Sequence, residues 1–382
     1  MIEVTGKNGT AKVFTEMVEA TALDQVKTMM DHVITLNTEV RLMPDIHFGK
    51  GATVGTSIQL PENRDEWKVS PNVVGVDIGC GMLSYKLSLK KQNRFDEKML
   101  RQLDEAIKKY VPSGFKVHTR IDKALNQSLN TFLKELNLPL TGKQHQHITH
   151  SVGTLGGGNH FIELAQDENK DYWLTVHSGS RNLGVQVVNY HQGIANDKST
   201  EEDKKMGLAY LEGENLNTYL NDMKIAQKFA AMNRRAMLDN IVENLPYQIE
   251  VKDEFDSIHN FISIEEGVIR KGATSAREGE RLIIPLNMKD GSIIAEGRGN
   301  ADWNNSAPHG AGRTMSRTAA KKNLSLNEFK EQMAEVYSTS VLKSTIDEAP
   351  NAYKPSTNIL ENAKDTMKVI HQLKPVYNFK AH

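Results

Sequence analysis

The sequence predicts a protein of mixed helices and strands, folded as one domain over residues 1–382. Two stretches support this class. Residues 201–245 repeat apolar side chains every three or four positions, which is typical of one face of a long helix. Residues 281–300 read as an apolar strand, a turn and a second strand. No internal repeat, low-complexity tract or long linker divides the chain, so we expect a single domain.

The composition is that of a globular protein without a global basic field. Hydrophobic residues make up 38% of the chain and the formal net charge is −1, so RNA binding would need a local stripe of Lys and Arg. Cys80 is the only cysteine, which excludes an intramolecular disulfide and fits a reducing compartment. The N-terminal residues show no basic-then-apolar signal pattern, and no long apolar run occurs. We therefore expect a cytoplasmic protein that does not span a membrane.

In the first part of the chain, residues 21–33 show the apolar spacing of a helix. Residues 44–58 contain a proline and three glycines that break any helix, and Asp45 and His47 alternate there as on a strand or in a loop. A lone histidine such as His47 is more often a surface residue than a ligand. Lys50 lies between two glycines, as in a loop that approaches phosphate, although the full Walker pattern is absent.

Residues 71–82 begin with a valine-rich run, which predicts a buried strand that ends near Asp77 and Cys80. A carboxylate and a thiol three residues apart on a glycine-rich turn are a plausible half-site for a divalent metal. The alternative is a buried cysteine that acts as a small hydrophobe, and that alternative is favoured when the segment is considered alone.

Residues 93–137 contain two helical stretches, which we expect to serve packing. A polar loop is predicted after them, with His145, His147 and His150. Two histidines separated by one residue are a known metal pattern, but a solvated loop explains them equally well.

Three further histidines lie on or next to apolar strands. A glycine-rich run in residues 153–165 leads to His160 and then to an apolar strand, and the strand in residues 173–184 ends near His177. His259 is also presented by an apolar strand. This repetition favours a functional site built at the ends of strands over a purely structural role for each histidine.

Smaller features complete the prediction. Asn233 interrupts the apolar face of the long helix and needs a hydrogen-bond partner if it is buried. Ser325 and Glu328 form a capping box that opens a helix. Residues 347–354 are predicted to be a loop.

The strand-end residues form a set of potential metal ligands, namely Asp77, Cys80, His160, His177 and His259. One thiolate, one carboxylate and three imidazoles suit Mn, Fe, Co or Zn rather than Mg or Ca. Five ligands exceed one tetrahedral site, and a thiolate that bridges two metals would use them economically. Two-metal sites stabilise the attacking and leaving oxygens in phosphoryl chemistry.

His309 remains outside this set, in residues 296–317, where four glycines and the arginines Arg298 and Arg313 surround it. Such a histidine could be a base, a metal ligand, a covalent nucleophile or a structural residue in a turn. With the metal ligands placed elsewhere, His309 is left to act as a nucleophile or as a general acid and base.

Eight stretches between residues 44 and 380 resemble one family in order, namely PDIHFGKGATVG, GVDIGCGM, GGGNHFIE, VHSGSRNLG, IHNFI, GRGN followed by HGAGR, DEAPNAYK, and the terminal Lys380. The chain resembles the RtcB family of RNA-splicing ligases, which join 3′-phosphate or 2′,3′-cyclic phosphate RNA ends to 5′-hydroxyl ends. Several of these motifs together are highly specific, and they span nearly the whole chain.

The resemblance implies an α+β fold with a central β-sandwich flanked by helices. It implies two Mn²⁺ ions, one held by Asp77, Cys80 and His160 and the other by Cys80, His177 and His259. His309 would be the residue guanylated by GTP. The guanosine nucleotide would be lined by Asn159, His160, Phe161, Ile162, Glu163, His259, Asn260, Pro285, Asn287, Met288, Ser292, His309, Gly310, Ala311, Gly312 and Lys380.

One segment departs from the family pattern. The family reads IPGSMG before Ser292, whereas residues 284–289 here read IPLNMK, so Leu286 and Asn287 replace a Gly-Ser pair. Leu286 narrows backbone freedom and Asn287 retains hydrogen-bonding groups, which bears on nucleotide affinity and base preference. The candidates for holding phosphates are Arg181, Arg298, Arg313 and Lys50.

Two other functions are compatible with part of this set. A dinuclear metallophosphoesterase acting on RNA ends would need the same metal ligands but neither a nucleotide pocket nor an essential His309. A non-catalytic RNA-binding subunit would have no use for the ligands. We expect a monomeric ligase of RNA repair or tRNA splicing.

Overall fold

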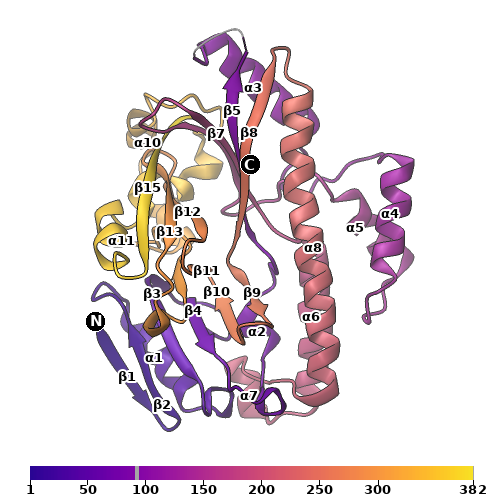
Figure 1. Ribbon diagram of the computed structural model, residues 1–382, viewed down its shortest axis with the longest axis vertical. Coiled ribbons are helices and arrows are strands. Elements are labelled where there is room, and N and C mark those ends of the chain that lie inside the picture. Colours follow the sequence, from indigo (N-terminus) through magenta and orange to yellow (C-terminus); the bar gives the residue numbers. More distant parts are fainter. Residues whose placement is uncertain (91–93, 382) are drawn as a thin grey trace.

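The computed structural model describes residues 1–90 and 94–381, and it contains two large β-sheets with helices packed around them (Figure 1). The predicted α+β class is confirmed. The first helical stretch predicted in residues 93–137 is observed as α3 (Glu97–Tyr110), while its expected first residue, Asn93, lies outside the described residues. Within the described part of the chain, no helix is both long and apolar enough to cross a membrane.

Seven strands of the described chain form the larger sheet, in the order β12 (Arg281–Asn287), β13 (Gly291–Gly297), β15 (Met367–Lys380), β6 (Phe161–Gln166), β7 (Tyr172–Ser178), β5 (Gly81–Leu89) and β8 (Ile249–Ile258). All neighbours are antiparallel. The sheet curls and brings its two edge strands together, and Arg281 on β12 forms an ion pair with Asp253 on β8. Its two halves enclose an apolar core that includes Met82, Trp173 and Ile294. The expected sandwich thus takes the form of one curled sheet.

The second sheet lies beside the first and combines strands from distant parts of the sequence. Its described strands run in the order β1 (Ile2–Gly6), β2 (Gly9–Val13), β3 (Glu39–His47), β4 (Val54–Gln59), β10 (Val268–Lys271) and β9 (Asn260–Ser263). Helix α1 (Ala20–Met30), as predicted, packs on β1 and β2. A short two-stranded sheet of β11 (Ala273–Ser275) and β14 (Ser306–Pro308) leads the chain to His309.

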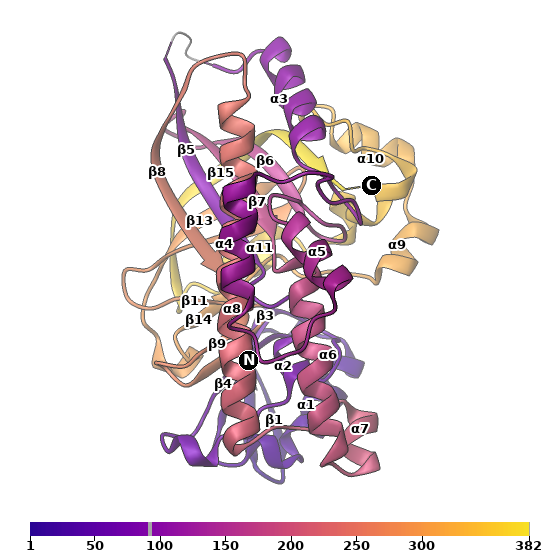
Figure 2. The same ribbon diagram turned by 90° about the vertical axis from the view of Figure 1, so that its right-hand side faces the viewer.

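The long helix α8 (Gly213–Glu243) links the cores of the two sheets, with α6 (Arg181–Asp197) packed beside it (Figure 2). The N-terminal part of its apolar stripe, from Leu216 to Phe229, belongs to the core of the six-stranded sheet. The C-terminal part, from Met237 to Ile241, packs with α3 against the larger sheet. The partner expected for Asn233 is confirmed, because this buried side chain accepts from the Thr154 N–H and donates to two acceptors beside His177.

Helices α4 (Lys123–Leu133) and α5 (Gly142–His150) form an arm that projects from one side of the molecule (Figure 1). The polar loop predicted for His145, His147 and His150 is wrong, since all three lie on α5. Thr141 and Gln144 open that helix with a reciprocal capping box. The sequence does not show the apolar periodicity of a helix here, because α5 has few apolar residues.

Two other local predictions need correction. The valine-rich run at residues 71–82 is not a strand, because it begins with helix α2 (Pro71–Val74), and the strand β5 begins only at Gly81. Pro71 occupies the first helical position, which proline favours, and one turn is too short to show a helical period. The predicted loop at 347–354 contains the 3₁₀ helices η4 (Lys343–Glu348) and η5 (Pro350–Ala352).

The remaining described elements connect these layers. Ser325 caps α10 by accepting from the Glu328 N–H, so the predicted helix start is confirmed. The short helices are η1 (Val33–Thr35), η2 (Arg64–Glu66), α7 (Glu201–Met206), η3 (Ala301–Trp303), α9 (Arg317–Asn323), α10 (Leu326–Gln332) and α11 (Ser356–Asn362).

Candidate metal centre and nucleotide cavity

Five potential metal ligands meet at one end of the larger sheet. Asp77 and Cys80 lie in the turn before β5, His160 immediately precedes β6, and His177 is the second-last residue of β7. His259 lies between β8 and β9, and its backbone N–H donates to the Cys80 carbonyl at 2.9 Å. All five residues therefore lie at or next to the ends of strands, as expected for a site built at the end of a sheet.

Strand register explains why residues so far apart in the sequence meet. His177 pairs with Met82 on one neighbouring strand and with Phe161 on the other. In antiparallel strands, the starts of β5 and β6 lie beside the end of β7. Cys80 and His160, which shortly precede Met82 and Phe161, are thereby brought next to His177.

The thiol of Cys80 is shared by two groups of ligands. One group is Asp77, Cys80 and His160, the other is Cys80, His177 and His259, and the ligand atoms of each group lie within 4.8 Å of one another. The Sγ atom lies 3.6 Å from Nε2 of His160 and 3.2 Å from Nε2 of His177. Nε2 of His160 lies 2.9 Å from Oδ2 of Asp77, and the Nε2 atoms of His177 and His259 are 3.2 Å apart.

Hydrogen bonds on the far side of two rings make this donor set suitable for a metal. Nδ1 of His160 lies 2.8 Å from the Leu155 carbonyl, and Nδ1 of His177 lies 3.3 Å from the Asn159 carbonyl. A carbonyl only accepts, so in the neutral rings Nδ1 carries the proton and Nε2 presents its lone pair toward Cys80. Lone pairs that face one another and a thiolate are stabilised by a cation between them, so the residues fit a divalent metal.

Burial and neighbouring charges control the ionisation of the same groups. Burial raises the pKa of Asp77, but the adjacent His160 outweighs it and brings that pKa to about 2. Burial, together with the Asp77 charge, holds the pKa of the Cys80 thiol well above its ordinary value. Burial also holds the pKa values of His177 and His259 well below the ordinary value. The lowered pKa values favour the neutral, metal-binding form of His177 and His259, and a bound cation favours release of the thiol proton.

The loops that carry the ligands are fixed from behind. The fully buried Arg234 of α8 donates to the carbonyls of Gly79 and Ser178, at 2.7 and 3.0 Å. Gly179 is required by close approach, because a Cβ atom there would lie 2.0 Å from Oδ1 of Asp77. Such fixed positions hold ligands in geometry before a metal arrives.

His309 lies next to this cluster, with its ring centroid 4.9 Å from that of His259. Its Nδ1 lies 2.6 Å from Oδ2 of Asp45, and its backbone N–H donates to the same oxygen at 3.1 Å. The carboxylate holds the ring proton on Nδ1, so Nε2 keeps a free lone pair. Gly312 allows this approach, since its φ is +73° and a Cβ there would lie 3.0 Å from Cα of Asp45.

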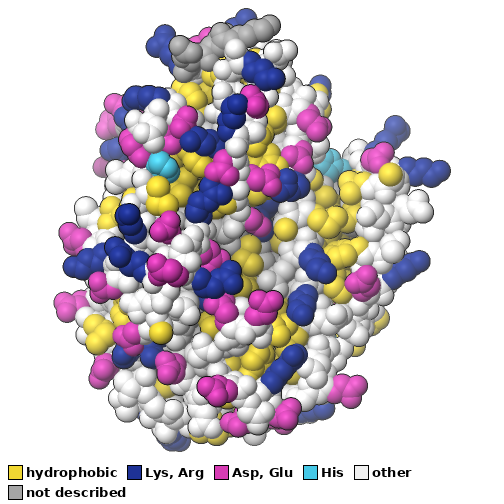
Figure 3. Space-filling view, viewed as in Figure 1, with side chains coloured by type: hydrophobic (Ala, Val, Ile, Leu, Met, Phe, Trp, Pro, Cys, Tyr) yellow, Lys and Arg dark blue, Asp and Glu magenta, His cyan; other side chains and the backbone are white. Residues whose placement is uncertain are grey.

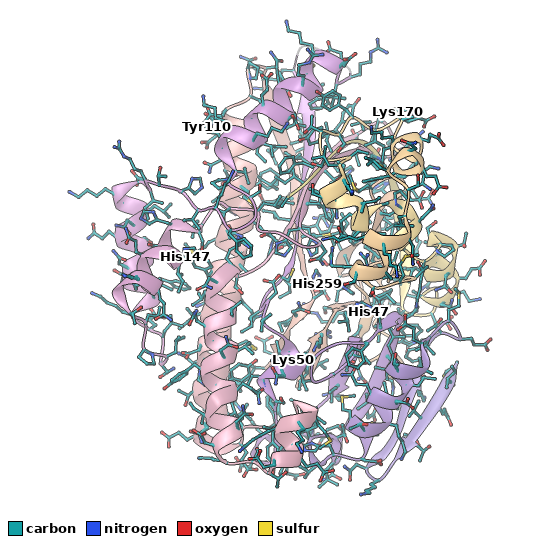
Figure 4. All side chains as sticks on the ribbon, turned by 180° about the vertical axis from the view of Figure 1, so that it is seen from behind. His47, Lys50, Tyr110, His147, Lys170 and His259 are labelled. Atoms are coloured by element: carbon teal, nitrogen blue, oxygen red, sulfur yellow. The ribbon has the colours of Figure 1, made fainter. Side chains whose placement is uncertain are left out.

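A cavity of about 480 Å³ opens beside His309, a volume within the range of small-molecule sites. In Figure 4, His259 and His47 lie near the middle of the molecule with Lys50 below them, and all three line the cavity. Most residues expected around a nucleotide also line it, namely Asn159, Phe161, Glu163, His259, Asn260, Pro285, Asn287, Met288, His309, Gly310, Ala311, Gly312 and Lys380.

Three of the expected residues are placed differently. Ile162 is fully buried in the apolar core on the other face of β6, because side chains alternate along a strand, so its side chain cannot contact a ligand in the cavity. Ser292 does not line the cavity among the described residues, but its hydroxyl donates to Glu163 at 3.2 Å. His160 does not line the cavity among the described residues and lies among the potential metal ligands.

An ion-paired group of side chains forms the far wall. Glu348 accepts from Lys380 at 2.5 Å, from Arg317 at 2.5 Å and from the Tyr353 hydroxyl at 2.7 Å. Burial raises the pKa of Glu348, but Lys380 and Arg317 outweigh it and bring that pKa to about 2. The ionised carboxylate therefore holds the Lys380 ammonium against the cavity, where Lys380 also lies 5.0 Å from the Phe161 ring centre.

Glu163 behaves differently from Glu348, although both are buried. Burial raises its pKa to about 7, because hydrogen bonds from Asn378 and Ser292 and the charge of Lys380 only partly compensate for lost hydration. A carboxyl group that titrates near neutral pH thus faces the cavity from β6.

The family model described as "tRNA-splicing ligase RtcB" matches residues 25–138 and 133–381. The chain belongs to the RtcB family. It is 34% identical over 407 residues to "RNA-splicing ligase RtcB" of Escherichia coli (strain K12), and the match covers 98% of each chain. The same identity, length and coverage are found for "RNA-splicing ligase RtcB1" of a second Escherichia coli strain. The resemblance inferred from the motifs is confirmed.

The substitution that distinguishes this RtcB protein from the usual motif has a structural consequence. Leu286 is buried and lines the cavity. The Asn287 side chain accepts from the N–H groups of Lys289 and Asp290 and donates to the Asp290 carboxylate, all within 2.9 Å. Its amide therefore stabilises the turn between β12 and β13, at a β-bulge, while Asn287 also lines the cavity.

The candidates for holding phosphates divide into two pairs. Lys50 and Arg313 line the cavity of this RtcB protein. Arg181 and Arg298 are not part of its lining among the described residues. Arg298 donates to the Met367 carbonyl, and Arg181 donates to the Gly114 carbonyl and to Thr154, so both serve loop structure.

Sequence reasoning missed several residues that the RtcB fold brings to the site. The alternating pattern around Asp45, two residues before His47, gives no sign of its contact with His309. Glu348 lies in the DEAP motif and Arg317 follows the His309 segment, but neither carries a local signal for the cavity. Lys271 also lines the cavity, where it donates to the carbonyls of Asn72 and Lys50, and burial lowers its pKa to about 7.

Proposed function

We propose that this RNA ligase joins RNA ends that carry a 3′-phosphate or 2′,3′-cyclic phosphate to 5′-hydroxyl ends, through a guanylate carried by His309, in RNA repair or tRNA splicing. The observation that carries the proposal is the position of His309. Its Nδ1 is held by Asp45, and its ring lies between the ligand cluster and a nucleotide-sized cavity. An imidazole with a fixed proton on one nitrogen is a competent nucleophile at the other.

His309 would act first on GTP. Its Nε2 lone pair attacks the α-phosphorus, a P–N bond forms, and pyrophosphate leaves with the electrons of the broken P–O bond. Asp45 keeps the proton on Nδ1 and stabilises the positive charge that develops on the ring. A 2′,3′-cyclic end is first opened by water to a 3′-phosphate and a 2′-hydroxyl. An RNA 3′-phosphate oxygen then attacks the same phosphorus and releases His309. Finally the 5′-hydroxyl oxygen attacks the activated 3′-phosphate and loses its proton to solvent, a phosphodiester forms, and GMP leaves.

Two Mn²⁺ ions would be held by the two ligand groups that share Cys80. When bound, such ions neutralise phosphate charge and polarise the reacting oxygens. A donor set with one thiol and three imidazoles favours Mn²⁺ or a similar transition metal over Mg²⁺. The pKa of Cys80 is high in the protein alone, so loading with metal should release a proton.

The guanosine part would occupy the cavity between β6 and the C-terminal end of β15. Glu163 offers a carboxylate that can accept from the N–H groups of guanine, and Lys380 is held nearby by Glu348. Lys50 and Arg313 are placed to contact phosphates at the cavity wall. The RNA-splicing ligase relatives favour this ligase function over the phosphoesterase alternative.

The test is the intact mass of the protein after incubation with GTP and Mn²⁺. We expect a gain of one GMP that is lost in acid, as a phosphoramidate is, and no gain in the His309→Ala variant. Metal analysis of the same samples should give two ions per chain, and Cys80→Ser should lose most of both. If RNA ends are hydrolysed without any protein-bound GMP or joined product, the phosphoesterase alternative becomes the better account.

A further inference from the structure

Phe115 is the most exposed large hydrophobic side chain among the described residues, and it is fully accessible to solvent. It follows Gly114, which also faces open space, because a Cβ atom added to Gly114 would have no other atom within 4 Å. A single exposed apolar side chain is common on protein surfaces, so the case for a role of Phe115 rests on the residues around it. Phe115 lies between α3 and the projecting arm of α4 and α5.

The turn that carries Phe115 is fixed to the loop that carries the metal ligand His160. The Leu155 N–H donates to the Pro112 carbonyl at 2.9 Å, and the Gly114 N–H donates to the Gly156 carbonyl at 2.8 Å. Leu155 in turn accepts from Nδ1 of His160 at 2.8 Å. Hydrogen bonds of the residues around Phe115 therefore connect its turn to the loop that carries His160.

Arg181 strengthens this connection from the other side. Its guanidinium donates to the Gly114 carbonyl at 2.8 Å and to the Thr154 hydroxyl at 3.1 Å. Arg181 also has a positive φ of 56°, which is uncommon for a residue other than glycine and indicates a constrained position. The Phe115 turn is thus built into the site's framework.

An exposed strip leads from the cavity to Phe115. Asn159 lines the cavity, and it is exposed together with Gly157 and Gly158. A Cβ atom at Gly158 would meet no atom within 4 Å, and one at Gly157 would meet only Cα of Gly114, at 3.9 Å. Glycines of this kind let a ligand backbone pass close to the protein.

The surface beyond Phe115 carries positive charge. Lys116, Arg120 and Lys123 are exposed, and none of them forms an ion pair within the described ranges 1–90 and 94–381. The nearby carboxylate of Asp122 caps α4 by accepting from two backbone N–H groups. Figure 3 shows Lys and Arg side chains on the projecting arm, of which α4 is a part. An exposed aromatic ring beside unpaired cations is the composition of a single-stranded nucleic acid site.

We propose that Phe115 stacks on a base of the RNA strand that leaves the cavity over Gly157 to Asn159, while Lys116 and Arg120 contact its phosphates. The proposal rests on the RNA ligase function above and adds a strand-binding surface outside the reaction centre. Stacking does not distinguish between bases, so this surface would hold RNA ends of varied sequence. Phe115 is a positioning residue and does not take part in the chemistry.

The experiment compares three proteins, the wild type, Phe115→Leu and Phe115→Tyr. Leucine keeps an apolar side chain of similar size, whereas tyrosine keeps the aromatic face. We expect Phe115→Leu to raise KM for RNA roughly 5- to 100-fold, by analogy with the loss of one base–aromatic stack, and to leave the yield of protein-bound GMP unchanged. Phe115→Tyr should retain the wild-type KM. A 5-iodouridine placed near the joined end should cross-link to Phe115.

A second measurement tests the phosphate contacts. The Lys116→Ala/Arg120→Ala variant should reduce the salt dependence of RNA binding by roughly one and a half counterions, because each contact to a single strand releases about 0.7. If the wild type joins RNA but Phe115→Leu changes neither KM for RNA nor the cross-link pattern, the proposal is overturned. The exposed ring would then be better explained as a contact for a protein partner. A wild type that neither gains GMP nor joins RNA would instead overturn the proposed function itself.

Discussion

Two of the His–Asp pairs among the described residues join an imidazole nitrogen to a fully buried carboxylate. His309 and Asp45 approach to 2.6 Å at the cavity, and His191 and Asp222 approach to 2.8 Å between α6 and α8. Both carboxylates are fully buried. The His–Asp contact by itself therefore does not distinguish the two pairs.

The surroundings of the second ring nitrogen separate the two pairs. Nδ1 of His191 is buried and has no hydrogen-bond partner within the described residues, and the Tyr219 ring covers it with centroids 5.3 Å apart. Asp222 also accepts from the backbone N–H groups of Asn137 and Leu138, so it ties the projecting arm to α8. The free nitrogen of His309 belongs to a ring that lines a cavity instead. A His–Asp pair thus becomes a site only where its other nitrogen can reach a substrate.

The largest effect should come from His309→Ala. This variant should form no protein-bound GMP and should join no 3′-phosphate ends, because the proposed nucleophile is absent. Metal content and melting temperature should stay close to wild type, since the five ligands lie on other residues. An RNA already activated with a 3′-guanylyl end should restore joining, at least in part. Labelled GTP and gel analysis of the joined RNA provide the measurements, and an adduct on this variant would sink the assignment.

The next effect should come from Asp45→Asn. An amide can donate to Nδ1 and so stabilise the wrong tautomer, which should slow guanylate transfer about 10²- to 10⁴-fold. Rapid-quench measurement of protein-bound GMP at saturating GTP separates this loss in rate from a loss in affinity. A rate within twofold of wild type would show that Asp45 is only a structural partner of His309.

In contrast, Asp222→Ala should damage stability. It leaves His191 and two backbone N–H groups without an acceptor in the core, which should lower the free energy of unfolding by about 3–5 kcal/mol. The exposed Glu243→Ala on the same helix is the control and should change it by less than about 0.5 kcal/mol. Denaturant titration measures both, and GMP transfer by the folded fraction should be unchanged. A stable Asp222→Ala protein that no longer transfers GMP would show that the His191–Asp222 pair serves the reaction rather than stability.

The pH dependence of this pair has a definite sign. Burial raises the pKa of Asp222, but hydrogen bonds from His191 and Asn137 outweigh it, so the pKa lies below the ordinary value of 3.8. A carboxyl with a lowered pKa stabilises the fold above its unfolded value and loses that contribution as pH falls through the lowered value. The difference in stability between wild type and Asp222→Ala should therefore be constant at neutral pH and shrink only in acid.

The smallest effect concerns Glu163, whose pKa is shifted in the opposite direction, to about 7 by burial. If its carboxylate accepts from guanine, GTP should bind up to about tenfold more tightly at pH 8 than at pH 6, because ionisation is nearly complete only at the higher pH. Calorimetry on His309→Ala avoids the reaction. The Glu163→Gln variant should bind more weakly and without this pH step. If GTP affinity changed with pH by the same factor in Glu163→Gln, the pH dependence would belong to another titrating group.

Much of the fold was readable because its signals are local. The apolar stripe of α8, the helix α1 and the β12–β13 hairpin each repeat a pattern within one element, and all three predictions are confirmed. The valine-rich run at 71–82 and the histidines of α5 were misread because one turn, or a polar helix, carries no clear period. The single domain and the monomeric state stay predictions.

The sequence by itself determined the family, because its motifs occur in a fixed order along the chain, and it predicted the residue types of the candidate site. It did not determine which side chains touch. The contact between Asp45 and His309 joins residues 264 positions apart, and the Lys380–Glu348 ion pair closes the cavity from the last strand. Side chains alternate along β6, so Ile162 points into the apolar core instead of the cavity. The Arg298 side chain donates to the Met367 carbonyl instead of facing the cavity. These facts depend on strand register and chain crossings, which are set by packing over the whole chain and not by neighbouring residues.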